Sequence, residues 1–128
     1  MKSEEQKLYR LIDANLNRLR EGIRTLEDIQ RYIYDNEMLA KRLKDLRHQV
    51  RYEDKNLLTY RDIMGDILKE TTPSEAKRNN MKELIQANIK RAQEAARVLE
   101  EAFKLIDSTM AQRFKQIRYE LYDIEKDL

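Results

Sequence analysis

A stretch of fifteen residues occurs twice in this chain, and this internal repeat constrains the fold more than any other feature. Residues 14–28 read ANLNRLREGIRTLED and residues 87–101 read ANIKRAQEAARVLEE, so seven of the fifteen positions are identical. The shared pattern, A-N-x-x-R-x-x-E-x-x-R-x-L-E, has helical spacing. The segments that follow also align, because LAKRLKDLR at residues 39–47 corresponds to MAQRFKQIR at residues 110–118. The repeated unit is therefore a pair of helices.

Helix breakers are almost absent, since the 128 residues include only two glycines and one proline. A composition rich in Glu, Lys, Arg, Leu and Ala favours helix throughout. We therefore predict an all-α fold in a single domain over residues 1–128. Its two repeated long helical hairpins, residues 3–52 and 72–127, would pack as a helical bundle with a pseudo-twofold axis. A central connector segment, residues 53–71, has no counterpart in the second half.

Start signals and apolar stripes predict four helices. They span about residues 3–34, 36–52, 72–106 and, after a cap at Asp107 or Ser108, the segment up to residue 127. Ser3 begins a capping box, and TPSE at residues 72–75 combines a capping box with proline at the first helical position. The connector has a mixed pattern with a bend at Gly65. A functional loop and a short packing helix are both open interpretations of it.

Composition excludes several classes of function. Charged residues make up 39% of the chain, yet the net charge is only +2 with the signs interleaved. This pattern is typical of ion-paired helix surfaces and not of a nucleic-acid-binding protein. Cysteine is absent and His48 is the single histidine, so disulfides and a zinc enzyme are not expected. No apolar run is long enough to cross a membrane and the N-terminus lacks the apolar core of a signal peptide, so we expect a cytoplasmic protein.

The repeat places polar side chains against the apolar face of each long helix. On a helical wheel Asn15 falls inside the apolar stripe and Arg18 lies at its edge, and Asn88 and Arg91 take the same places in the second copy. A buried amide needs hydrogen-bond partners, and an arginine beside a core needs an anion or carbonyl groups. Two interpretations are open. The side chains line a cleft for an anionic ligand, or the two asparagines meet as a polar pair across the pseudo-twofold axis.

Other repeated charges lie away from the core. Glu21 and Arg24, with their counterparts Glu94 and Arg97, would form surface ion pairs that contribute only a few tenths of a kcal/mol. Because so small a contribution explains their repetition poorly, a ligand surface or a homodimer interface is a better explanation. We therefore predict a homodimer, although common ancestry of the two halves would also account for the repetition.

Two further arginines, Arg47 and Arg118, flank the apolar stripes of the second and fourth helices. With Arg18 and Arg91 they would form an anion-binding cluster; solvated helix-surface arginines are the alternative interpretation. The chain contains neither GxxxxGK[ST] nor GxGxxG, so it lacks the glycine-rich loops that hold nucleotide phosphates. Arginine clusters and helix N-termini would have to bind any phosphate.

Four segments together resemble a small all-helical family of thiamin biosynthesis. They are DANLNRLREGIRTLED at residues 13–28, LKDLRHQVR at 43–51, YRDIMGD at 60–66 and NIKRAQEAARVLEE at 88–101. The resemblance covers nearly the whole chain in motif order. Members of that family occur alone at about this length or fused ahead of thiamin-phosphate synthase. This chain departs from the family in its central segment, where Ile63 and Met64 are apolar and polar residues are expected.

The resemblance implies a kinase that uses ATP and Mg²⁺ to phosphorylate 4-amino-5-hydroxymethyl-2-methylpyrimidine phosphate to the diphosphate. On this hypothesis phosphates are bound by Arg18, Arg47, Arg91 and Arg118, and the pyrimidine or phosphate oxygens are oriented by Asn15 and Asn88. Mg²⁺ would be held by Asp62, Asp66, Glu27 or Glu100. The catalytic residues would be Arg61 and Asp62. The acceptor is itself a phosphate whose second pKa is about 6, so it needs no strong general base. Two alternatives are open: a non-catalytic helical module that assists or dimerises with thiamin-phosphate synthase, and a helical interaction protein in which the motif is a packing device.

Overall fold

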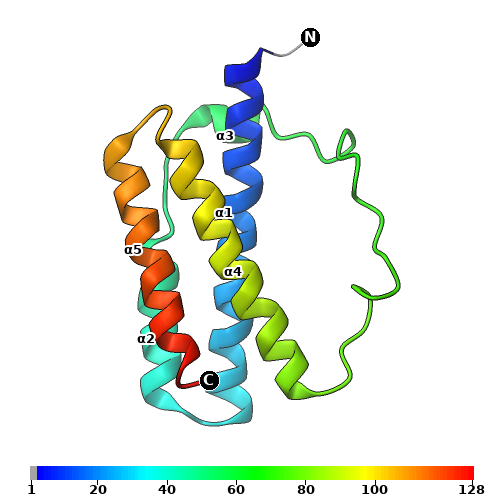
Figure 1. Ribbon diagram of the computed structural model, residues 1–128, viewed down its shortest axis with the longest axis vertical. Coiled ribbons are helices and arrows are strands. Elements are labelled where there is room, and N and C mark those ends of the chain that lie inside the picture. The colour runs from blue at the N-terminus through cyan, green and yellow to red at the C-terminus, as the bar shows by residue number, and fades with distance from the viewer. Residues whose placement is uncertain (1–2) are drawn as a thin grey trace.

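The computed structural model describes residues 3–128, which form helices joined by loops and contain no strand (Figure 1). The predicted all-helical fold class is confirmed. In chain order the elements are α1 (Glu4–Asp28), the π-helical turn η1 (Ile29–Ile33), α2 (Glu37–Gln49), the short α3 (Lys55–Thr59), α4 (Met81–Phe103) and α5 (Ser108–Glu125). The two long helices, α1 and α4, pack along each other and run in opposite directions, while α2 packs against α1 and α5 against α4.

Side-chain caps fix where the helices begin. Ser3 forms the predicted capping box, because its Oγ accepts the N–H of Gln6 at 3.2 Å and Gln6 Oε1 accepts the N–H of Ser3 at 3.0 Å. Asn36 caps α2, and Asp107, one of the two caps predicted for the last helix, caps α5. Each cap satisfies a backbone N–H that the first turn of a helix leaves without a partner.

The predicted start of the third helix at residues 72–75 is wrong. Glu75 does close this turn, because its carboxylate accepts hydrogen bonds from the hydroxyl of Thr72 at 2.7 Å and from its backbone N–H at 3.1 Å. The turn does not continue as a helix, and α4 begins only at Met81 with Asn80 as its cap. This stretch carries no large apolar side chain, and most helices in proteins are stabilised by burial of an apolar face. The connector therefore extends to Asn80.

The connector begins with α3, which packs against α1, so the interpretation as a packing helix holds for its first few residues. Beyond Tyr60 the chain runs through turns and extended segments on the side of the bundle away from α2 and α5, at the right of the view in Figure 1. A tight turn at Gly65 is closed by its N–H, which donates to Asp62 Oδ1 at 2.8 Å. A Cβ on Gly65 would collide with that carboxylate, so a larger residue at this position would displace the Asp62 side chain.

One apolar core runs through the bundle. Its most deeply buried large side chains are Ile12, Leu16, Leu19, Ile23, Leu26, Leu43, Leu46, Ile89, Leu99, Phe103, Phe114 and Ile117. Two apolar residues with the helical spacing of the predicted helix over residues 3–34 are instead exposed: Leu11 at 42% and Ile33 at 52%. Ile33 leaves the core because the wider π-helical turn shifts the register of α1 at its end. Across residues 3–128, no helix combines the length and the apolar character needed to span a membrane.

Candidate functional site

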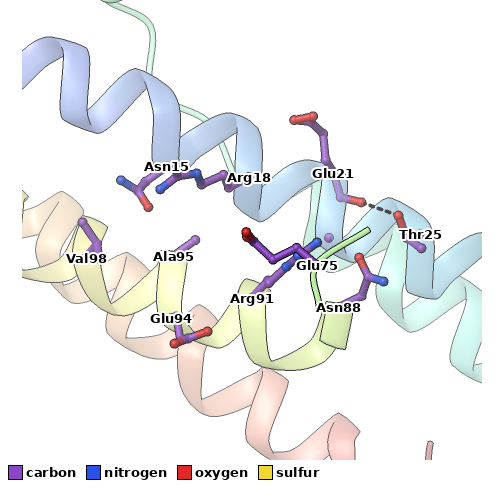
Figure 2. Close-up of a pocket in the computed structure, with 11 residues that line it drawn as sticks. Asn15, Arg18, Glu21, Thr25, Glu75, Asn88, Arg91, Glu94, Ala95 and Val98 are labelled. Carbon is purple, nitrogen blue, oxygen red and sulfur yellow. Dashed lines mark hydrogen bonds between the residues drawn. The ribbon is translucent and has the colours of Figure 1, made fainter. Parts of the chain in front are cut away.

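An open depression lies between α1 and α4 (Figure 2). Its volume is about 520 Å³. The lining consists of Asn15, Arg18, Glu21, Gly22 and Thr25 from α1, Asn88, Arg91, Glu94, Ala95 and Val98 from α4, and Glu75 from the connector. The repeated Asn, Arg and Glu of both motif copies therefore line one place, which we call the motif pocket.

The antiparallel packing of the two long helices sets the order of side chains in the motif pocket. Gly22 lies opposite Asn88, since a Cβ on Gly22 would be 3.4 Å from the backbone oxygen of Asn88. Asn15 lies at the other end of the pocket, and Arg18 and Arg91 lie between the two asparagines (Figure 2). The pocket thus has two similar halves, each with one amide and one guanidinium group.

The two asparagines do not form the polar pair that one interpretation of the sequence predicted. Asn15 Nδ2 donates to the backbone oxygen of Leu11 at 3.0 Å, and Asn88 Nδ2 donates to that of Leu84 at 2.9 Å. Each amide nitrogen is thus used within its own helix, four residues back. Within residues 3–128 neither amide oxygen has a hydrogen-bond donor, so each remains available as an acceptor in the pocket.

The two arginines of the motif pocket differ in their surroundings. Within residues 3–128 the guanidinium of Arg18 makes no hydrogen bond or ion pair. Arg91 lies near Glu75 of the connector (Figure 2). The pKa of Glu75 is lowered, mainly by the hydrogen bond from the Thr72 hydroxyl and then by the Thr72 backbone N–H, with a further contribution from the charge of Arg91. Arg91 therefore lies within the electrostatic range of the Glu75 carboxylate, while Arg18 makes no ion pair among residues 3–128.

Three contacts hold the start of the connector against α1. Asp13 accepts two hydrogen bonds of 2.7 Å from Nε and a terminal nitrogen of Arg61. Arg10 donates to the backbone oxygen of Asp62 at 2.9 Å, and the amide of Gln6 donates to the hydroxyl of Tyr60 at 3.1 Å. The three α1 residues lie on one face of the helix. These contacts place the Arg61-Asp62 segment beside the motif pocket.

A second depression, which we call the connector pocket, lies between α1 and this segment and has a volume of about 660 Å³. Its lining consists of Lys7, Arg10, Leu11, Asp13, Ala14, Asn15, Asn17, Arg18, Arg61, Asp62, Ile63, Asp66 and Val98. Asn15, Arg18 and Val98 line both pockets. The two pockets therefore adjoin, and at their boundary lies Arg18, whose positive charge has no ion-pair partner in the described part of the chain.

Four of the predicted site residues lie in neither pocket. Arg47 Nε bonds Glu27 Oε1 at 2.8 Å, and Arg118 bonds Glu100 Oε1 at 3.0 Å. Both glutamates are buried, and the Glu27 hydrogen bond raises the pKa of the Arg47 guanidinium. The two arginines thus lie apart from both pockets, and each neutralises a buried carboxylate on a neighbouring helix; their predicted phosphate-binding role stays a prediction.

The four predicted Mg²⁺ ligands lie in separate places. Glu27 and Glu100 are engaged in the buried ion pairs, while Asp62 and Asp66 lie in the connector pocket. Asp66 Oδ1 accepts the N–H of Leu68 at 3.0 Å, so its carboxylate closes a turn as that of Asp62 does. No group of three or more His, Cys, Asp or Glu within residues 3–128 could hold a metal ion. The residues do not fit a preformed magnesium site.

Two side chains at the site were not predicted from the sequence. Asp13 is 6% exposed and anchors Arg61, and no periodic pattern in the sequence indicated this burial. Glu75 reaches the motif pocket from a loop, and no sequence pattern indicated this because the segment was expected to start a helix. Both residues act through contacts distant in sequence, which local periodicity does not report.

The fold and the two pockets define an all-helical protein that presents duplicated amide and guanidinium groups in a groove between two antiparallel helices. The chain belongs to the ThiD2 family, whose model matches residues 10–127. No solved structure matches the chain.

The curated relatives are longer proteins. The chain is 41% identical over 126 residues to a protein of Nostoc punctiforme named thiamine-phosphate synthase, covering 97% of this chain and 36% of the relative. Proteins of the same name from Synechocystis sp. and Rhodopirellula baltica are 42% and 37% identical over 94% and 98% of this chain, and over 36% and 35% of their own lengths. The chain therefore spans about a third of the length of these relatives.

Proposed function

We propose that this chain acts in thiamin biosynthesis and transfers the γ-phosphoryl group of ATP to 4-amino-5-hydroxymethyl-2-methylpyrimidine phosphate, giving the diphosphate and ADP. Membership of the ThiD2 family and the thiamin-pathway name of the relatives support the pathway. The observation that carries the reaction is that two adjoining pockets share Arg18. A phosphotransferase has to hold two polyanions with their reacting groups in contact, and a cation at the boundary between the two pockets suits that task.

The chemistry suits the residues of the two pockets. An oxygen of the acceptor phosphate attacks the γ-phosphorus, a new P–O bond forms, and the bond to the β,γ-bridging oxygen breaks so that ADP leaves. Because the acceptor is largely a dianion at neutral pH, no general base is required. Arg18 and Arg91 would neutralise phosphate charge in the motif pocket, and Lys7 and Arg10 would do so in the connector pocket.

The proposal assigns no step to a protein-bound metal ion, because the carboxylates of residues 3–128 do not gather into a metal site. Asp62 and Asp66 stay in the proposal as pocket-lining carboxylates, with Arg61 as the residue that anchors their segment to α1. Arg47, Arg118, Glu27 and Glu100 leave the proposed site and become parts of the scaffold.

We also infer that the bundle consists of two copies of one helical hairpin. The Glu27–Arg47 pair links α1 to α2, and the Glu100–Arg118 pair links α4 to α5, so corresponding motif residues make corresponding contacts. On this view the connector is the element that distinguishes the two halves of the motif pocket.

A second candidate function is a non-catalytic module that assists or dimerises with thiamin-phosphate synthase. Exposed apolar side chains on the connector favour it: Ile63, Met64, Ile67 and Leu68 are all strongly exposed. Proteins rarely expose such a cluster without a partner. The relatives' greater length is also consistent with an attached or associated partner.

A turnover assay separates the two candidates. Purified protein would be incubated with ATP, Mg²⁺ and the pyrimidine phosphate, and the diphosphate and ADP quantified by ion-exchange chromatography. We expect turnover that falls at least 100-fold in Arg18→Gln and persists in Arg24→Gln, which removes the same charge from α1 outside both pockets. Absence of diphosphate across several metals and nucleoside triphosphates would refute the kinase proposal and leave the non-catalytic module as the remaining candidate function. Light scattering on the same sample tests the predicted homodimer.

A further inference from the structure

We propose that Asn15 selects substrates that carry an amino group on the ring, and that Asn15 and Arg18 together recognise an amine and a phosphate on neighbouring positions of one heterocycle. This inference rests on the proposed function and deepens it. It names the half of the motif pocket that the acceptor occupies and the group that sets its specificity.

The chemistry of Asn15 is fixed by its partner. A backbone carbonyl can only accept a hydrogen bond, so the amide nitrogen must face the oxygen of Leu11, 3.0 Å away. The Oδ1 atom is left as a pure acceptor in a side chain that is only 6% exposed, and it points toward α4 in Figure 2. A buried acceptor favours an N–H donor and disfavours a carbonyl or phosphate oxygen. Asn15 therefore favours an amine over a phosphate.

The spacing of the two side chains matches this pattern of groups. Arg18 follows Asn15 by three residues, about 4.5 Å along the helix axis and on the same face. Its guanidinium has no partner within residues 3–128 and would accept an anion. A six-membered ring with an amino group on one carbon and a phosphorylated hydroxymethyl group on the next presents a donor and an anion at a similarly short separation.

The two halves of the motif pocket are not equivalent for this ligand. Arg91 lies close enough to Glu75 for its charge to lower the pKa of that carboxyl, and a carboxylate held there would repel a phosphate, whereas Arg18 makes no ion pair among residues 3–128. Asn15 also borders the connector pocket, where the proposed phosphoryl donor would lie, and Asn88 does not. The structure therefore assigns the acceptor to the Asn15–Arg18 half.

A binding experiment without nucleotide tests this assignment. Isothermal titration would compare the pyrimidine phosphate with its analogue that carries an oxo group in place of the amine. The wild-type protein is expected to bind the amino compound at least about tenfold more tightly, because the oxo analogue sets an acceptor against Oδ1. Asn15→Leu is expected to reduce this ratio to about one, while Asn88→Leu keeps it.

The outcomes are separable from those of the turnover assay. Equal binding of the two compounds by the wild-type protein would overturn the inference without any variant, so misfolding of Asn15→Leu does not leave it untested. A preference lost in Asn88→Leu and kept in Asn15→Leu would also overturn it. If the wild-type protein prefers the amine but forms no diphosphate, the kinase proposal fails and the assignment of Asn15 stands.

Discussion

The carboxylate of Asp13 accepts two hydrogen bonds of 2.7 Å from the guanidinium of Arg61, and this pair joins α1 to the connector immediately before the repeated motif. A planar bidentate pair fixes the direction of both side chains as well as their separation. It therefore holds the segment that forms one wall of the connector pocket.

Asp13→Asn is expected to loosen this wall and lower turnover. The substitution keeps the size of the side chain but removes the charge and one of the two acceptors. Because small displacements of positioning groups reduce rates strongly, we expect a loss on the order of 100-fold in kcat. Steady-state kinetics check this, with Asp45→Asn on α2 as the control of equal charge change. Unchanged kcat in a folded Asp13→Asn protein would show that the connector wall takes no part in the reaction.

Arg118→Met is expected to destabilise the fold without changing the site. The side chains of Arg118 and Glu100 are 10% and 7% exposed, so the substitution leaves a buried carboxylate with only the longer contact of 3.8 Å to Arg97. Removal of one member of a buried pair typically costs about 3–5 kcal/mol. Urea unfolding measures the loss, and Arg118→Met combined with Glu100→Leu should recover most of it. Loss of ligand affinity in folded protein would return Arg118 to the list of binding residues.

Acid should weaken the fold through Glu125 and Asp123. The pKa of Glu125 is lowered from its ordinary value of 4.5, first by the hydrogen bond from Gln93 and then by that from Lys90. The pKa of Asp123 is lowered mainly by its hydrogen bond from Arg42. A carboxylate with a lower pKa in the folded chain stabilises it above the unfolded pKa, and this contribution is lost as pH falls through the folded pKa. Stability measured by urea unfolding should therefore fall below about pH 4.5, and less steeply in Glu125→Gln.

Gly22 should tolerate alanine and reject leucine. A Cβ at this position would lie 3.4 Å from Ala92 Cβ, a tight but allowed contact, and the second copy of the motif has Ala95 at the equivalent place. Gly22→Ala should therefore change stability by no more than about 1 kcal/mol, since gained helix propensity offsets the contact. Gly22→Leu should force α1 and α4 apart and cost about 1–3 kcal/mol. Thermal unfolding compares them, and a stable Gly22→Leu protein would contradict the close packing.

The sequence predicted most of the helices because their signals are local. The caps at Ser3, Asn36 and Asp107 each act over three residues, and the repeated motif reports one helix face. The false start at residues 72–75 had an equally good local signal, and it failed because nothing near Glu75 has an apolar face to bury.

At the candidate site, too, the sequence predicted what local spacing determines and missed what tertiary packing determines. The repeat indicated that Arg18 and Arg91 belong together, but spacing alone did not separate them from Arg47 and Arg118. All four follow the same helical periodicity. Only the tertiary packing determines that Arg47 and Arg118 meet buried glutamates, while Arg18 faces open space. Glu75 comes to the site through a long loop, whose path no periodic pattern reports.

Glu75→Gln is expected to increase the affinity for phosphate-bearing ligands. Glu75 lies near Arg91, so its carboxylate competes with an incoming anion and repels it. The substitution removes the charge and keeps an oxygen that accepts from Thr72, so the local turn should persist. We expect a few-fold lower Kd for ATP or the pyrimidine phosphate, measured by titration at low ionic strength, and a smaller gain at high salt because salt screens exposed charges.

Glu70→Gln, on the same connector but outside both pockets, is the matched control and should leave Kd unchanged. An equal gain in both variants would reflect net charge alone, whereas a loss of affinity in Glu75→Gln would mean that the carboxylate contacts the ligand directly.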